Sequence, residues 1–176
     1  MISAPTKRKI AMISTGGTIE KTYDELAGVM QNAVSNLDVM LASLQLHGVS
    51  IVRVPLMNKD SLDMTPADHE LIARTAGAMA EAHDGVVVVH GTDRLAATGE
   101  RMVALLGRPP VPIVLTGAMR PFELRHSDAL QNLTEALLAV QIAPPGVYVA
   151  MHNHVLEFPG VVKDPRFGTF VRAQTT

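Results

Sequence analysis

Cysteine and tryptophan are both absent from the 176-residue chain, and aromatic residues make up only 3% of it. The absence of cysteine excludes disulfides, thiolate metal ligands and a cysteine nucleophile. Because aromatic side chains are scarce, the core has to be built from Val, Ile, Leu, Ala and the 10 Met residues. The composition is nevertheless that of a soluble globular protein, with 47% hydrophobic and 18% charged residues.

Neither sign of charge dominates, since the formal net charge is −2 and no basic stripe is visible. We therefore expect no nucleic-acid partner, and we interpret Lys7-Arg8-Lys9 as the solvated edge of a strand. No apolar run is long enough to span a membrane. No apolar segment of the signal-peptide kind follows the N-terminal charges, so we expect no secretory signal and a cytoplasmic location.

Short apolar runs alternate with helical patterns along the whole chain. This alternation predicts an α/β fold with a doubly wound, mostly parallel sheet, helices on both faces, and a single domain over 1–176. The continuous β-branched run Gly85-Val86-Val87-Val88-Val89 is typical of a strand buried on both faces. The expected strands are 10–13, 49–54, 85–89, 113–115 and 147–150, and the expected helices are 37–47, 66–82, 95–106 and 127–141.

Helix-start signals support these helices. Thr65-Pro66-Ala67-Asp68 combines an N-cap threonine, proline at the first helical position and an acid in the first turn. Ser35 and Ser127 are the predicted N-caps of the first and last helices.

Three loops follow strands of the predicted sheet and combine glycine with hydroxyl or charged groups. They are Thr15-Gly16-Gly17-Thr18, His90-Gly91-Thr92-Asp93 and Gly117-Ala118-Met119. In an open parallel sheet, ligands bind beyond the carboxyl ends of the strands, so these loops are the expected site. Their glycines would allow a small polar ligand to approach backbone N–H groups closely.

Each loop also has an ordinary structural interpretation. The glycine pair after Thr15 could cradle an anion, form an oxyanion hole beside a nucleophile, or only serve a tight strand exit. Asp93 could cap the following helix, bind the ammonium group of a ligand, or do both. His90 ends a buried strand, which favours a hydrogen-bonded structural histidine over a general base.

A hydroxyl nucleophile needs an activating group, and a lysine is one such group. The chain has five lysines, of which Lys7 and Lys9 lie at the wrong end of the first strand. Lys21, Lys59 and Lys163 remain as candidates.

The three loop segments, extended to Thr15–Ile19, His90–Asp93 and Thr116–Pro121, resemble the signature segments of bacterial-type L-asparaginases in the same order. Asp60–Pro66 resembles a fourth segment, and Pro145–Val149 with the later Val162-Lys163 resembles a fifth. Any single motif could be accidental, but the collinear set covers nearly the whole chain.

The resemblance implies an amidohydrolase that converts L-asparagine and water to L-aspartate and ammonia through an acyl-enzyme, without a metal or organic cofactor. It implies that Thr15 is the nucleophile, that Thr92 positions the hydrolytic water and that Asp93 binds the α-amino group. The residues implied to line the substrate site, with Ser61 and Asp60 on the α-carboxylate, are Gly16, Asp60, Ser61, Gly91 and Ala118.

Tyr23 and Lys163 are implied less directly. Tyr23 lies where the family carries a mobile loop with a catalytic tyrosine, although a tyrosine there could equally belong to a surface loop. No lysine precedes the Gly-Ala-Met segment, where Pro110-Val111-Pro112 stands. We therefore expect Lys163, where the family also has a lysine, to supply the activating ammonium; the alternative is a lysine that faces solvent.

The chain also departs from the family pattern. Arg94 replaces a small hydroxyl residue and Leu62 replaces a more polar one, and both could reshape the substrate pocket. The family has a second, C-terminal domain, whereas this chain is expected to be either a short one-domain form of the enzyme or one domain of a longer protein. We expect it to self-associate as a homo-oligomer, because without the second domain the sheet and helix surface would expose apolar area that a partner subunit could cover.

Three other functions compete with this one. A regulatory module that binds an amino acid without turnover is the alternative from another class. Within enzymes, a glutaminase and the amidase part of a tRNA-dependent amidotransferase are alternatives, the second being disfavoured because the chain carries no basic domain. His152 and His154 are expected to alternate along a strand, but two histidines without nearby carboxylates give a weak metal signal.

Overall fold

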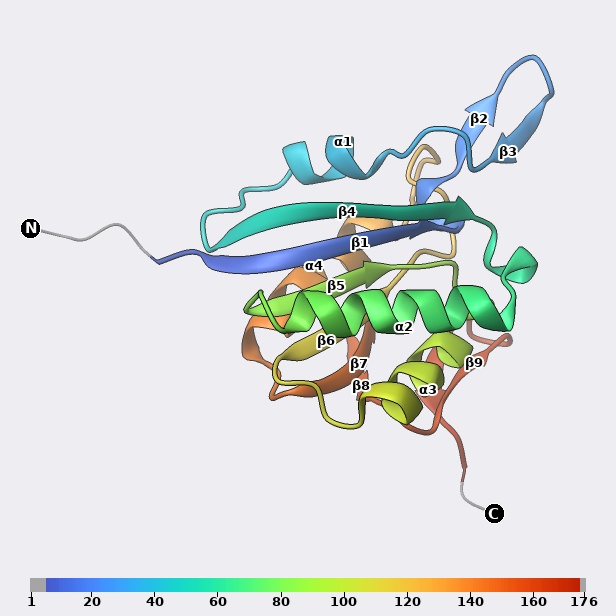
Figure 1. Cartoon of the computed structure of the whole chain (residues 1–176). Coiled ribbons are helices and arrows are strands. Elements are labelled where there is room, and N and C mark those ends of the chain that lie inside the picture. Colours follow the sequence, from blue (N-terminus) through green and yellow to red (C-terminus); the bar gives the residue numbers. More distant parts are fainter. Residues whose placement is uncertain (1–5, 175–176) are drawn as a thin grey trace, which may run out of the picture.

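A six-stranded sheet forms the centre of the molecule in the computed structural model, which describes residues 6–174 (Figure 1). The strand order is β4-β1-β5-β6-β7-β8, and all pairs are parallel except the last. The predicted α/β fold is therefore confirmed. The strands are β1 (Arg8–Gly16), β4 (Val49–Lys59), β5 (Gly85–Val89), β6 (Pro112–Thr116), β7 (Gly146–Met151) and β8 (His154–Glu157).

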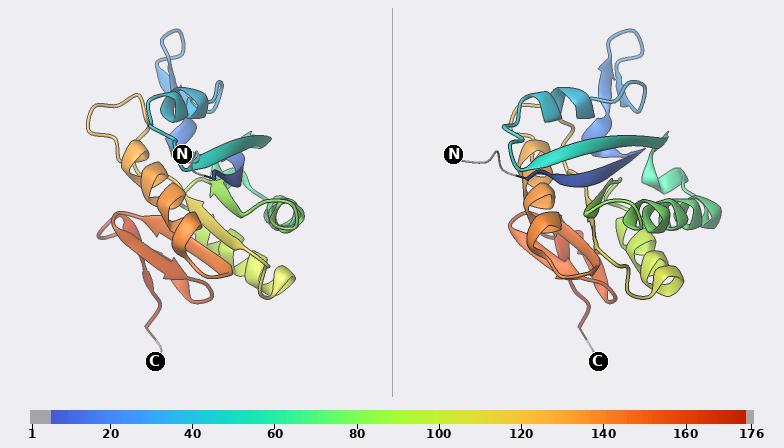
Figure 2. Two further views of the ribbon diagram at one scale, coloured as in Figure 1. Left: turned by 90° about the vertical axis from the view of Figure 1, so that its left-hand side faces the viewer. Right: turned by 60° about the vertical axis from the view of Figure 1, so that its left-hand side comes forward.

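Helices cover both faces of this sheet, as Figure 2 shows. One face packs against α2 (Pro66–Ala80) and α3 (Leu95–Leu106). The other packs against α4 (Ala129–Ile142) and the short α1 (Leu37–Ala42).

The alternation of side chains along β1 explains the two layers. Ala11 and Ile13 belong to the cluster under α2 and α3, whereas Ile10 and Met12 belong to the cluster under α1 and α4, and all four are fully buried. Because successive side chains of a strand point to opposite faces, a strand with two buried faces must be apolar throughout.

The start of α2 agrees with the prediction in detail. The Thr65 hydroxyl accepts from the Asp68 amide, and the Asp68 carboxylate accepts from the Thr65 amide, which completes a capping box ahead of Pro66. The predicted N-caps Ser35 and Ser127 were each wrong by one residue.

The N-caps of α1 and α4 are Asn36 and Asp128, and neither side chain makes a capping hydrogen bond. The Ser35 and Ser127 hydroxyls instead accept from the backbone N–H two residues later. The first helix is also shorter than expected and ends at Ala42 instead of His47.

Several elements were not predicted. The hairpin of β2 (Thr22–Asp24) and β3 (Val29–Gln31) projects from the body in Figure 1, and β9 (Val161–Asp164) pairs with β10 (Thr169–Arg172). Two 3₁₀ turns, η1 (Thr18–Glu20) and η2 (Ser61–Asp63), follow β1 and β4.

The expected alternation of His152 and His154 along one strand is wrong. His152 lies in the turn between β7 and β8 with φ 53°, and only His154 belongs to a strand. In a separate finding, no helix within the described part of the chain is long and apolar enough to cross a membrane.

The order of the strands places a topological switch point between β1 and β5. The chain runs from β1 to its neighbour β4 on one side, and then crosses to β5 on the other side of β1. Ligands of doubly wound sheets bind in the crevice at the carboxyl ends of such a strand pair. This edge carries Thr15 and the His90–Asp93 segment.

Candidate active site

Thr15 is the last but one residue of β1 and lies at the switch point. Its side chain is fully buried, and its Oγ1 donates to the carbonyl oxygen of Val89, the last residue of β5, over 2.9 Å. The hydroxyl therefore bridges the two strands that flank the crevice.

The glycine pair that follows Thr15 uses its own amides to hold the loop. The Gly16 N–H donates to Glu20 Oε2 (3.0 Å), and the Gly17 N–H donates to the Lys59 carbonyl (2.8 Å). These two amides are therefore not available for an oxyanion, so that hypothesis is wrong for this pair. Both glycines have positive φ values, 96° and 81°, which a residue with a side chain rarely adopts.

Glycines in these loops also let four loops meet, because they carry no side chains. A methyl group at Gly17 would lie 2.3 Å from Gly91 Cα, and one at Gly91 would lie 2.6 Å from the Ser61 hydroxyl. Similarly, a methyl group at Gly117 would lie 2.3 Å from the His90 carbonyl oxygen. The loops after β1, β4, β5 and β6 are therefore in direct contact and form one continuous wall.

Glu20 is a part of this wall that the sequence reasoning missed. Its side chain is 1% exposed, and its carboxylate accepts from the Gly16 amide and from the Ser35 hydroxyl. Burial raises the pKa of Glu20 above its usual value, and these two hydrogen bonds offset part of the rise. Only the tertiary partners distinguish it from a surface glutamate, so a single sequence gives no signal for it.

The second cluster gathers three predicted residues. Lys163 in β9 donates from Nζ to Thr92 Oγ1 (2.9 Å) and to Asp93 Oδ1 (2.7 Å). Lys163 does not face open solvent, since its side chain is 23% exposed. Asp93 does not cap α3: the N-cap is Arg94, without a side-chain capping bond.

The Thr92 hydroxyl also lies close to the loop after β6, 3.6 Å from the sulfur of Met119. Asp128 fixes that loop, because its carboxylate accepts from the backbone N–H groups of Met119 and Arg120 and from the His152 ring. Burial alone would raise the pKa of Asp128, but these hydrogen bonds outweigh it and lower the pKa.

Asn132 completes this support from inside α4. It is fully buried, and its amide donates to the Gly117 carbonyl (2.9 Å) and to Asp128 Oδ2 (2.8 Å). Ala118, one of the predicted lining residues, is held between these bonded neighbours and is fully buried.

Asp60 and Ser61 lie at the end of β4, where η2 begins. The Asp60 carboxylate accepts from the Leu62 amide and from Lys21 Nζ (2.7 Å), and the hydrogen bond from Lys21 lowers its pKa. Ser61 is 1% exposed and contacts Gly91, whereas Leu62 is 61% exposed. Lys21 is therefore paired with Asp60, while Ser61 lies at the contact with the Gly91 loop.

Tyr23 is a predicted residue that lies on the β2–β3 hairpin and not at the edge of the central sheet. It lies in β2, its side chain is 58% exposed, and its backbone N–H donates to Glu123 (2.7 Å). Among the described residues, no hydrogen bond joins Tyr23 to Thr15.

His90 has the structural environment that the sequence predicted. It is fully buried at the end of β5, and its Nδ1 lies 2.8 Å from the Gly91 carbonyl oxygen. Burial lowers the pKa of His90 to about 4, so the ring is neutral near pH 7.

Known proteins share both the sequence pattern and the fold. Residues 9–165 match the family model described as "Asparaginase, N-terminal". The thermostable L-asparaginase from Thermococcus kodakarensis has a similar structure, with a TM-score of 0.83 and 32% sequence identity over 93% of this chain and 51% of that one.

Curated sequences divide between two descriptions. An L-asparaginase from Thermococcus kodakarensis is 35% identical over 84% of this chain and 45% of its own length. A glutamyl-tRNA(Gln) amidotransferase subunit from Methanobrevibacter smithii is 34% identical over 85% of this chain and 34% of its own length. This chain thus spans less than half the length of these curated relatives. From the family match and the shared fold together, the chain belongs to the asparaginase family and corresponds to the N-terminal part of its members.

Proposed function

We propose that this chain hydrolyses the side-chain amide of L-asparagine, with Thr15 as nucleophile. The observation that carries the proposal is the Lys163 ammonium within hydrogen-bonding distance of both Thr92 and Asp93, in a wall that is continuous with the Thr15 loop. Hydroxyl nucleophiles and a charge network around them are the arrangement that two-step acyl transfer requires.

In the first step, Thr15 Oγ bonds to the amide carbon and the C–N bond breaks. The hydroxyl proton ends on the leaving nitrogen, which departs as ammonia. In the second step, a water held at Thr92 adds to the β-aspartyl ester, the ester C–O bond breaks, and Thr15 regains its proton as aspartate leaves.

The charges of the site suit this substrate. The Asp93 carboxylate, 45% exposed, can receive an α-ammonium group. The Ser61 hydroxyl, at the contact between the loops, can donate to an α-carboxylate. Lys163 would stabilise the alkoxide character of Thr92 as that residue orients the water.

A steady-state assay of ammonia release from asparagine tests the proposal. Replacing Thr15 by Ala should lower the rate by about 10⁴-fold or more, because it removes the atom that forms the covalent bond. Thr15→Ser keeps the hydroxyl and should retain measurable turnover. Release by the unchanged chain that is no faster than release by Thr15→Ala would refute the proposal.

The amidase component of a tRNA-dependent amidotransferase is the second candidate. It is favoured by the 34% identity to a glutamyl-tRNA(Gln) amidotransferase subunit, which is close to the 35% identity to an L-asparaginase. The lack of a basic domain does not count against it, because the chain matches only 34% of that relative's length. The glutaminase alternative is tested separately. Rates on asparagine and on glutamine, measured side by side, distinguish an asparaginase from a glutaminase.

The regulatory-module alternative loses part of its support. One part of that support is the lysine missing before the Gly-Ala-Met segment, yet the Lys163 ammonium lies beside Thr92 and Asp93. Binding of asparagine without ammonia release would restore it.

A further inference from the structure

A chain of three side chains runs from the outside of the molecule to the active-site wall. His69 Nδ1 lies 2.7 Å from Thr98 Oγ1, and Thr98 Oγ1 lies 2.7 Å from His90 Nε2. The other ring nitrogen of His90 lies 2.8 Å from the Gly91 carbonyl oxygen. Thr98 and His90 are fully buried, whereas His69 is half-buried.

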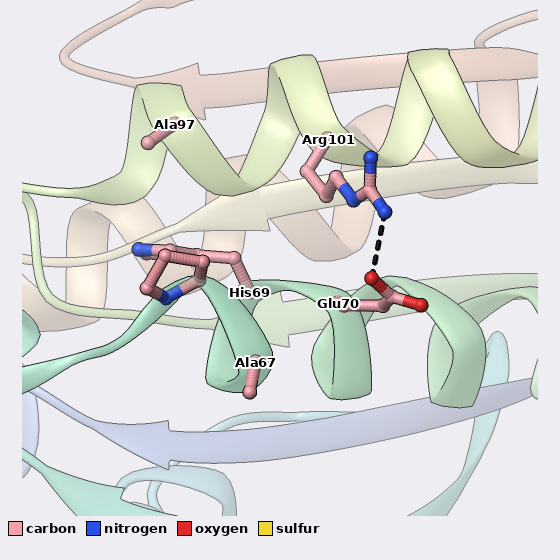
Figure 3. A pocket seen from close by; sticks show the side chains of 6 residues that line it. Ala67, His69, Glu70, Ala97 and Arg101 are labelled. Carbon is pink, nitrogen blue, oxygen red and sulfur yellow. Dashed lines mark hydrogen bonds and ion pairs between the residues drawn. The ribbon is translucent and has the colours of Figure 1, made fainter.

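The outer end of this chain lies at a surface pocket. His69 is on α2 and lines a cavity of about 570 Å³ between α2 and α3. Figure 3 shows its ring at this cavity, beside the ion pair in which Arg101 of α3 reaches Glu70 of α2. The rings of His69 and His90 are nearly parallel, with their centroids 6.3 Å apart.

The direction of every hydrogen bond follows from the chemistry of the groups. A carbonyl oxygen only accepts, so His90 Nδ1 carries the proton. The buried ring is neutral, because burial lowers the pKa of His90 to about 4, so Nε2 has no proton and accepts. The Thr98 hydroxyl therefore donates to His90. Its single proton is then used, so it must accept from His69 Nδ1–H.

The last acceptor is a peptide group of the catalytic wall. The Gly91 carbonyl belongs to the same planar unit as the Thr92 N–H, so fixing one end of that unit fixes the other. Gly91 has no side chain to restrain its own rotation. The ordered chain of donors supplies that restraint, and Thr92 carries the hydroxyl that Lys163 contacts.

We infer that His69 is a positioning residue, which acts through Thr98 and His90 to fix the Gly91–Thr92 peptide and hence the hydroxyl of Thr92. This inference rests on the proposed function, in which Thr92 orients the hydrolytic water. His69 itself touches no substrate.

The test compares His69→Ala with His69→Asn, whose side-chain amide N–H can replace the Nδ1–H. His83→Ala is the matched control, because His83 is also half-buried, lies in the turn just after α2, and has a hydrogen bond only to the Met79 carbonyl. We expect His69→Ala and Thr98→Val to lower kcat on asparagine about tenfold while KM changes less than about threefold. His69→Asn should recover most of kcat, and His83→Ala should change it less than about twofold.

Imidazole ¹⁵N spectra give a readout that does not need turnover. They should show His90 protonated at Nδ1 alone, and the Thr92 amide resonance should move more in His69→Ala than in His83→Ala. An unchanged kcat per folded molecule in both His69 variants, with only a lower melting temperature, would overturn the inference. A His90 ring protonated at Nε2 would do the same.

The two proposals fail in different ways. If the unchanged chain releases no ammonia from any amide, the proposed function fails. The spectra then decide the inference alone: an unmoved Thr92 resonance in His69→Ala overturns it, and a shift larger than in the His83 control supports it.

Discussion

The candidate active-site residues come from two regions that differ in how firmly they are held. At the sheet edge, Thr15 is fully buried and Thr92 is 3% exposed, and each hydroxyl is hydrogen-bonded to a partner distant in sequence. On the β2–β3 hairpin, Tyr23 is 58% exposed and Leu26 is 95% exposed. The sheet edge is built by packing, and the hairpin is built mainly by its own turn.

This difference has an energetic meaning. Segments with few buried apolar contacts open at low free energy, whereas core strands open only with the whole fold. The sheet edge is therefore the firmly held part of the candidate site, and we expect the hairpin to open at lower free energy than the sheet. Loss of a sheet-edge group should abolish chemistry, while changes on the hairpin should only modulate it.

After the loss of the Thr15 hydroxyl itself, the largest expected effect is at Lys163. Lys163→Met should lower kcat on asparagine by about 10²–10³-fold, because Thr92 and Asp93 lose the ammonium that they share. Binding of asparagine, measured by calorimetry, should weaken far less. Lys59→Met is the control, since Lys59 pairs with Asp68 at the surface, and its loss should change kcat less than about twofold. Equal turnover in the two variants would show that Lys163 has no greater role in the reaction than the surface residue Lys59.

Acidification should act through the sheet edge. The pKa of His90 is lowered from 6.5 to about 4 in the folded chain, so between these values the unfolded chain binds a proton that the folded chain does not. The contribution of His90 to the free energy of unfolding is therefore complete above pH 6.5. It is lost as the pH drops towards 4, and the total loss is about 3 kcal/mol. Urea unfolding at pH 7 and pH 4.5 measures it, and His90→Gln should flatten that part of the dependence.

The smallest predicted effect is on the hairpin. Tyr23→Phe should lower kcat by about tenfold if the phenol polarises Thr15, without a change in melting temperature, because the side chain is mostly exposed. Leu26→Ala, at the tip of the same hairpin, should leave kcat within about twofold. A tyrosine variant as active as the leucine variant would reduce the hairpin to a surface loop.

The sequence predicted the parts of the fold whose signals are local. The run Gly85–Val89 is apolar because both its faces are covered, and Thr65-Pro66 marks a helix start through backbone chemistry alone. The loops at the switch point could also be predicted, because parallel strands place their carboxyl ends at one edge.

The remaining features depend on distant partners. Glu20 and Asn132 are buried polar residues whose roles come from hydrogen bonds to Gly16 and Gly117. The β2–β3 and β9–β10 hairpins are short pairs without a strong apolar pattern. His152 adopts a positive φ, which is uncommon for any residue other than glycine, so no periodicity could place it in a turn.

The contact of Gly17 with Gly91 fixes the distance between the loop after β1 and the loop after β5. The separation between the Thr15 loop and the Thr92 loop is fixed there by the close approach of two backbones and not by any side-chain rotamer. Substitutions in the surrounding core can therefore change the stability of the fold while the loops that carry Thr15 and Thr92 keep their spacing. A methyl group at either glycine would clash with the other loop and push the two loops apart.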